Sequence, residues 1–237
     1  MTAAIFGTAL LSGCDTAVPL FVRTEEPMLY LVLSADPPVA PDAAQSAILA
    51  TTGVPTSLEF RTADEFALYR VADNAAFVFR NRVPAPPRQG NYELPELADA
   101  EGLGRTNLQP GQTYRLRVIT HGREITGTVT IPLRPILRVE ADGIERRLIW
   151  NKVAGSSTYL VNGINVNNGL QSTTDTFVVL PHIAAGNDNL ARITISAIDS
   201  NYASSLRDGA IIAGVRGAYG ILGARSSSEI IVILETR

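Results

Sequence analysis

The 237-residue chain contains one cysteine and two histidines. These counts exclude a disulfide-stapled scaffold and leave too few soft ligands for a closed zinc site. Charged residues make up 18% and hydrophobic residues 46%, which excludes a highly charged coiled coil and a disordered tail. The net charge of -3 comes without the basic clusters that track phosphates, so we expect no nucleic-acid partner.

The chain also lacks the common catalytic motifs. There is no Gly-x-Ser-x-Gly elbow, no His-Glu-x-x-His and no phosphate-binding loop. His121 and His182 lie in expected turns, and the carboxylate pairs at 64–65 and 99–101 are interpreted as solvated loop charges. Asp and Glu from distant segments could still assemble in space, which sequence does not reveal. We expect no enzymatic activity, no cofactor and no catalytic metal.

Two oxygen-rich clusters raise the question of calcium. Residues 187–189 read Asn-Asp-Asn and residues 199–201 read Asp-Ser-Asn, one before and one after a single expected strand. Their side chains would lie at opposite ends of that strand, so a shared site is not expected. Asx turns explain both clusters, and we predict no metal.

The start of the chain predicts export. Residues 1–13 carry no charge, and their apolar run is too short for the roughly 20 residues that span a bilayer. A short apolar run closed by small residues is typical of a secretory signal. Its end, Leu11-Ser12-Gly13-Cys14, resembles the lipobox of bacterial lipoproteins.

The lipobox resemblance implies a signal peptide at 1–13, diacylglycerol on the thiol of Cys14 and a lipid-anchored tether at 14–27. The alternative is an ordinary buried segment with a free cysteine. Asp15 resembles the signal that retains lipoproteins at the inner membrane, so we expect the periplasmic face of that membrane rather than the outer membrane.

The body of the chain predicts an all-β protein. The clean alternation of Tyr114-Arg-Leu-Arg-Val118 is typical of a strand with one buried and one wet face. In the first half we expect strands at 28–34, 57–61, 66–71, 76–80, 113–120 and 124–131. Residues 42–50 are a weak candidate helix.

A boundary is expected at residues 131–135, because Pro132 and Pro135 cannot donate backbone hydrogen bonds. In the second half we expect strands at 136–140, 147–151, 158–162, 174–180, 190–198 and 229–234. Short strands between turns predict two tandem immunoglobulin-like or fibronectin type III-like sandwiches, at 28–132 and 133–237.

Particular motifs strengthen this prediction by resemblance. Leu148-Ile-Trp150 followed by Ser157-Thr-Tyr-Leu-Val161 looks like fibronectin type III strands, which implies that Trp150 and Tyr159 pack together in the core. Residues 108–118 are similar to transthyretin-like and carboxypeptidase regulatory-like modules. As a whole, the chain resembles uncharacterised bacterial surface lipoproteins of two β-sandwich modules, and the resemblance implies no enzymatic activity.

Residues 209–224 are rich in glycine and apolar residues, but their spacing does not match a dinucleotide fingerprint. One interpretation is a glycine-bent connection covering the end of a sandwich. The other is an apolar loop that meets a partner or the membrane interface. Its contact candidates are Ile211, Ile212, Val215, Tyr219, Ile221 and Leu222, with the tether residues 18–22 as a further candidate.

Together these features predict a membrane-anchored, extracytoplasmic binding or scaffolding lipoprotein. Its expected partner is a membrane-protein complex, for example a transporter or a photosynthetic reaction-centre assembly, which it would serve as an accessory extramembrane subunit. The alternative is a glycan-binding surface lipoprotein linked to polysaccharide uptake. An aromatic content of 6% and a Trp150 that we expect to be buried disfavour a sugar platform.

Overall fold

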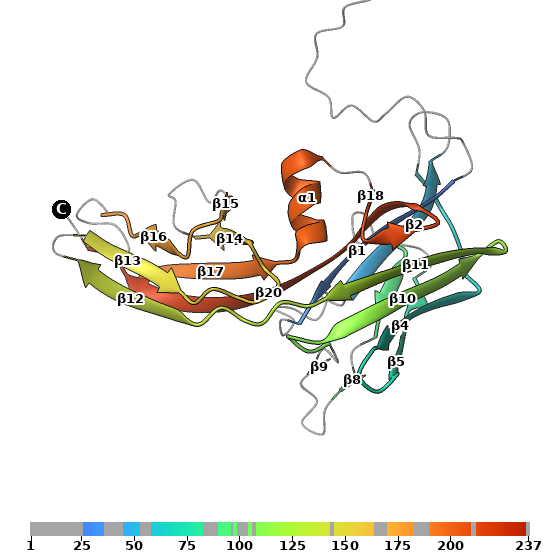
Figure 1. The fold of residues 1–237 in the computed structure, drawn as a ribbon, viewed down its shortest axis with the longest axis horizontal. Helices are drawn as coiled ribbons and strands as arrows, with labels where there is room; N and C mark the ends of the chain where they lie inside the picture. The colour runs from blue at the N-terminus through green and yellow to red at the C-terminus, as the bar shows by residue number, and fades with distance from the viewer. Residues whose placement is uncertain are drawn as a thin grey trace, which may run out of the picture.

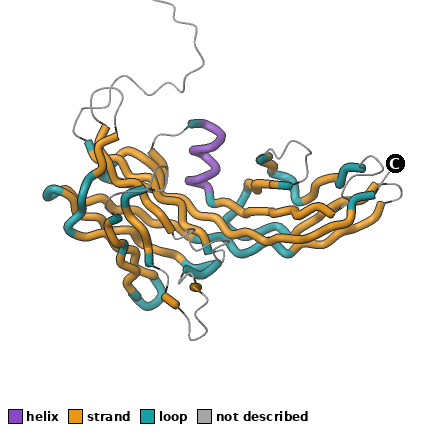
Figure 2. The backbone as a smooth tube through the Cα atoms, turned by 180° about the vertical axis from the view of Figure 1, so that it is seen from behind, coloured by secondary structure: helices purple, strands orange, loops and turns teal. Residues whose placement is uncertain are grey.

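The computed structural model describes residues 26–35, 45–52, 58–82, 90–95, 97–98, 104–105, 108–142, 145–163, 170–182, 190–209 and 212–235. These residues form an all-β sandwich fold of antiparallel and mixed sheets, as the sequence predicts, with a short helix on one side of the strand layers (Figures 1 and 2).

One long sheet runs through both halves of the molecule (Figure 1). In spatial order it contains β15 (Gln171–Thr173), β14 (Thr158–Asn162), β17 (Leu190–Ile198), β20 (Tyr219–Ile233), β1 (Pro27–Ser34), β2 (Gln45–Thr52), β7 (Tyr92–Leu94) and β6 (Arg80–Asn81). Two short strands pair beside this path, β18 (Ile212–Ala213) with β20 and β3 (Leu58–Phe60) with β2.

Two smaller sheets pack on the long one. The first covering sheet has the order β19 (Val215–Arg216), β11 (Arg123–Thr130), β10 (Thr113–Thr120), β4 (Glu65–Arg70) and β5 (Ala76–Val78). The second covering sheet has the order β12 (Leu137–Asp142), β13 (Glu145–Trp150) and β16 (Phe177–Val179). A separate ladder joins β8 (Leu97–Ala98) to β9 (Gly104–Arg105).

Strand β20 belongs to both halves. Its first part pairs in parallel with β1, from Met28↔Tyr219 to Ser34↔Arg225, and its second part pairs antiparallel with β17, from Ile198↔Arg225 to Leu190↔Ile233. Alternate residues of a strand face the same side, so Leu222, Ala224 and Val232 share one face of β20, and Leu234 follows directly after its end. The first two belong to the core under the first covering sheet and the last two to the core under the second.

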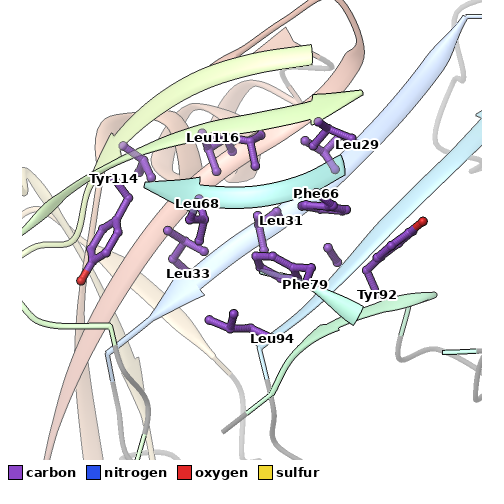
Figure 3. Close-up of a cluster of buried hydrophobic side chains, with 14 of the residues drawn as sticks. Leu29, Leu31, Leu33, Phe66, Leu68, Phe79, Tyr92, Leu94, Tyr114 and Leu116 are labelled. Carbon is purple, nitrogen blue, oxygen red and sulfur yellow. The ribbon is translucent and has the colours of Figure 1, made fainter. Parts of the chain in front are cut away.

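The core of the first sandwich is built from leucines of β1 and rings of the facing strands (Figure 3). Leu29, Leu31 and Leu33 are buried because alternate residues of β1 face the covering sheet. The ring of Phe66 stacks on Phe79 at a centroid distance of 4.5 Å. The apolar residues that alternate along β1 and β10 therefore form parts of the two facing inner surfaces of a sandwich.

The core of the second sandwich contains the ring pair that the fibronectin-like motifs imply. Trp150 of β13 and Tyr159 of β14 are buried, with an edge-on contact at a centroid distance of 5.4 Å. The two residues belong to opposite sheets, so this contact joins the layers.

Buried tyrosine hydroxyls bind backbone groups at the ends of the strands. The hydroxyl of Tyr159 accepts a hydrogen bond from the N–H of Val153 at 2.9 Å. The hydroxyl of Tyr114 accepts one from the N–H of Gln109, also at 2.9 Å. Buried backbone donors need such partners, so each phenol holds the turn before its own strand against the core.

The proline-containing connection between the halves is tied to the long sheet. Pro132 and Pro135 are buried, and the hydroxyl of Ser226, in the middle of β20, donates a hydrogen bond to the carbonyl of Leu133 at 2.8 Å. The division into modules at 28–132 and 133–237 stays a prediction. The structure adds that residues 219–225 complete the first sandwich.

Helix α1 (Ser200–Asp208) stands on β20, on the side opposite to the covering sheets (Figure 2). Gly223 makes this packing possible, because a Cβ there would lie 2.7 Å from Cβ of Tyr202. The Asp199 carboxylate caps the helix and also accepts the N–H of Ala224 at 2.8 Å. Burial raises the pKa of this carboxyl group.

Two local predictions are wrong. The weak helix at 42–50 is instead a strand over its described residues, since β2 pairs with β1 and buries Ala47 and Leu49 in the core. The last strand begins at Tyr219, ten residues before the predicted start. Glycines are poor strand formers, and here β20 gains its regularity from pairing with its neighbours rather than from its own propensity.

Removing the phenol oxygen of Tyr159 tests its structural role. We expect Tyr159→Phe to lower the free energy of unfolding by about 1–3 kcal/mol, because it leaves the buried N–H of Val153 without an acceptor. Denaturant unfolding followed by circular dichroism measures this change. The matched control is Tyr69→Phe, whose partly exposed hydroxyl donates to Glu65 and should change stability by less than about 0.5 kcal/mol. Equal effects of the two variants would contradict the assignment.

Candidate interaction surface

The outer face of the second covering sheet carries apolar residues where a solvated sheet face is usually polar. Directly opposite residues in antiparallel strands share a face. By this rule Ile149 of β13 lies beside Arg138 of β12 and Phe177 of β16. Arg147 lies two residues from Ile149 on the same face, opposite Val179. The row Ile149, Phe177 and Val179 is therefore turned away from the core.

A groove of about 460 Å³ follows this face. Its walls come from all three strands and the turn before β16, and they mix apolar side chains with charged ones. The lining residues are Arg138, Glu140, Ala141, Arg147, Ile149, Trp150, Thr176 and Phe177. We refer to this site as the outer groove.

Charged side chains hold the rim of the outer groove in place. The guanidinium carbon of Arg147 lies 5.4 Å from the centre of the Phe177 ring, within the range of a cation–π contact. Arg147 also donates to Glu145 at 3.1 Å, and Arg138 pairs with Glu140 at 2.8 Å. The rim therefore presents positive and negative groups beside the partly exposed ring of Phe177.

Trp150 connects the outer groove to the core. It lines the groove while its side chain is 95% buried, against Tyr159. Its indole Nε1 has no hydrogen-bond partner in the part of the chain that the structure describes. A buried donor without a partner costs about 1–3 kcal/mol, so Trp150 lowers the stability of this core while its ring fills it.

The structure buries some of the contact candidates within 209–224 and leaves others at the surface. Val215, Ile221 and Leu222 are core residues, the last fully buried, so they cannot offer side chains to a partner. We correct the expectation for these three: the segment forms β18, β19 and the start of β20 instead of an open loop. Ile212 is 52% exposed and Tyr219 is half-buried, so both remain surface candidates.

Other predicted positions lie outside the described residues. These are Cys14, the tether residues 18–22, Ile211, the pair at 99–101 and the cluster at 187–189. The lipidation of Cys14, the partner contacts of residues 18–22 and Ile211, and the loop interpretation of the other two clusters therefore stay predictions.

The remaining candidates have local roles. His121 is exposed at the β10–β11 turn with a positive φ of 48°, as the turn prediction requires, and His182 is half-buried. Glu65 forms an ion pair with Arg117 across β4 and β10. Asp199 is the N-cap of α1, so its carboxylate oxygens already accept backbone N–H groups, as the Asx-turn interpretation of this cluster implies.

Within the described ranges, no three side chains of His, Cys, Asp or Glu lie close enough to share a metal ion. Among the same residues, no helix has the length and apolar character needed to cross a bilayer.

Sequence reasoning missed the outer groove, although a signal was present. Arg147, Ile149, Phe177 and Val179 occupy the outward positions of two predicted strands, and three of these four are apolar. Which outward residues become neighbours depends on the pairing of β13 with β16, which the sequence does not show.

Comparison with known proteins adds no family: no protein-family model matches the chain, and no curated protein is significantly similar to it.

Proposed function

We propose that this protein is a lipid-anchored, extracytoplasmic accessory protein that binds a membrane-protein complex through its outer groove and performs no bond chemistry. The observation that carries the proposal is the outward apolar row of Ile149, Phe177 and Val179 beside the charged residues of the outer groove on the second sandwich. Transporters and photosynthetic reaction-centre assemblies are examples of the partner class.

The residue types of the outer groove support protein recognition. Aromatic residues and arginine are enriched at interface centres, and contacts of this kind dominate binding energies. Phe177 lines the outer groove and is 42% exposed, so a large part of its ring is accessible to a partner. Because Arg147 already lies over the Phe177 ring, both side chains are restricted before a partner binds. Less side-chain conformational entropy is then lost on binding.

The charges around the outer groove support selectivity more than affinity. Exposed ion pairs such as Arg138–Glu140 contribute about 0–1 kcal/mol to stability, so exchanging them for partner charges costs little. Because both signs of charge are present, in Arg138–Glu140 and Arg147–Glu145, a partner with charges complementary to these pairs is favoured.

The lipobox resemblance supports the anchor. A thioether-linked diacylglycerol on Cys14, with about 0.8 kcal/mol for each buried CH₂, would hold the chain firmly on a bilayer. Asp15 favours the inner membrane, so the proposed site of action is its periplasmic face.

Phe177 also favours a second candidate, a glycan-binding lipoprotein linked to polysaccharide uptake. An exposed ring beside Arg138 and Glu140 offers a stacking surface with hydrogen-bonding groups at its edge. Trp150 does not add to such a platform, because it is almost completely buried.

Intact-mass measurement of the membrane-extracted protein tests the anchor. We expect cleavage before Cys14 and the added mass of a diacylglyceryl group, and Cys14→Ser should abolish both. A wild-type chain that retains Met1 and a free thiol would contradict this part of the proposal.

Substitution in the outer groove tests partner binding. We expect Phe177→Asp to lower recovery of the copurifying complex at least tenfold after gentle detergent extraction, since hot-spot residues are worth about 2 kcal/mol or more. Quantitative mass spectrometry of the purified fraction gives the ratio. The control is Val78→Asp, an apolar residue 59% exposed on the first sandwich, which should leave recovery unchanged.

Unchanged recovery with Phe177→Asp would exclude the outer groove as the binding site. A glycan array separates the two candidates: binding that is lost in Phe177→Asp favours the glycan candidate over a protein partner.

A further inference from the structure

The end of the long sheet where β1 begins collects exposed apolar residues from three strands. Leu29 of β1 and Ile212 of β18 pair with Gly220 from opposite sides. Neighbouring strands lie about 4.8 Å apart, so Ile212 is roughly 10 Å from the second or third residue of β1. Met28 pairs with Tyr219 in the adjacent position.

The side chains at this end are of the interfacial kind. Ile212 is 52% exposed and Tyr30 is 40% exposed, while Met28 and Tyr219 are half-buried. Tyrosine combines an apolar ring with a polar tip and is enriched where proteins meet the headgroup region of a bilayer. Met28, Tyr30 and Tyr219 lie on one face of the sheet, and Ile212, which pairs with Gly220 beside Leu29, lies on the other, so the four residues flank the end of the sheet from both faces. We call these four residues, Met28, Tyr30, Ile212 and Tyr219, the anchor-end surface.

The length of chain before β1 indicates what covers this surface. Thirteen residue steps separate Cys14 from Pro27, a span of at most about 47 Å at 3.6 Å per residue. The fourteen steps of β20 cover about 46 Å at 3.3 Å per residue. The far end of β20 could therefore approach the lipid of Cys14 only with the tether almost fully extended, whereas the anchor-end surface needs no such extension.

We infer that the anchor-end surface lies against the bilayer that holds Cys14, with its apolar side chains in the headgroup region. This inference rests on the proposed lipidation of Cys14. β20 then leads away from the lipid, since it begins beside β1 and ends at the opposite end of the molecule (Figure 1). The second sandwich, with its outer groove, is held clear of the membrane, where an extramembrane part of a partner can reach it.

A single introduced thiol tests this orientation. Cys14 is the only cysteine of the chain, and its sulfur is blocked in the lipidated protein, so Ile212→Cys provides one reactive site. The matched control is Ile231→Cys, also isoleucine, 59% exposed, and about 36 Å along β20 from the partner of Ile212. Tyr30→Cys is a second variant of the anchor-end surface, should Ile212→Cys not fold.

Each full-length variant, with its lipid anchor, is labelled with an environment-sensitive fluorophore and reconstituted into phosphatidylcholine–phosphatidylglycerol vesicles containing a nitroxide lipid. We expect quenching at position 212 or 30 to be at least threefold stronger than at position 231. Equal quenching, or stronger quenching at 231, overturns the inference while the anchor stands. If the mass of the protein shows no lipid on Cys14, the proposed function fails, and the inference fails with it.

Discussion

The architecture depends on the change of partner within one strand. Arg225 of β20 is paired with Ser34 of β1 on one side and with Ile198 of β17 on the other. Before this residue β20 contributes to the first core, and after it β20 contributes to the second. Neither sandwich is complete without β20, so the two halves cannot separate without exposing apolar surface of both.

The contacts around this change of partner reinforce the coupling. On one face of β20, Gly223 admits Tyr202 of α1, and the Asp199 carboxylate binds the N–H of Ala224. On the other, Ser226 binds the connection that joins the covering sheets. A coupled body of this kind suits the proposed function, because it would hold the proposed lipid anchor and the outer groove at fixed positions relative to each other.

The sequence predicts best what depends on local periodicity. Strand β10 buries every second residue, as its alternating sequence predicts, and the contact of Trp150 with Tyr159 agrees with the motif that implied it. It predicts poorly what depends on pairing. β2 has helix-forming residues but is a strand because β1 lies beside it, and the glycine-rich start of β20 hides a strand that places Leu222 in the core. The outer groove was missed for the same reason, since Ile149 and Phe177 meet only in the register of β13 with β16.

Hydrogen exchange along β20 tests the coupling most directly. If both sandwiches depend on β20, its backbone amides that are hydrogen-bonded to neighbouring strands between positions 221 and 232 should share one opening free energy. They should then lose protection together as denaturant is added. Mass spectrometry of overlapping peptides, or NMR, resolves the two parts. Separate exchange of residues 221–224 and 227–232, with different opening free energies, would show two independent units and contradict the account.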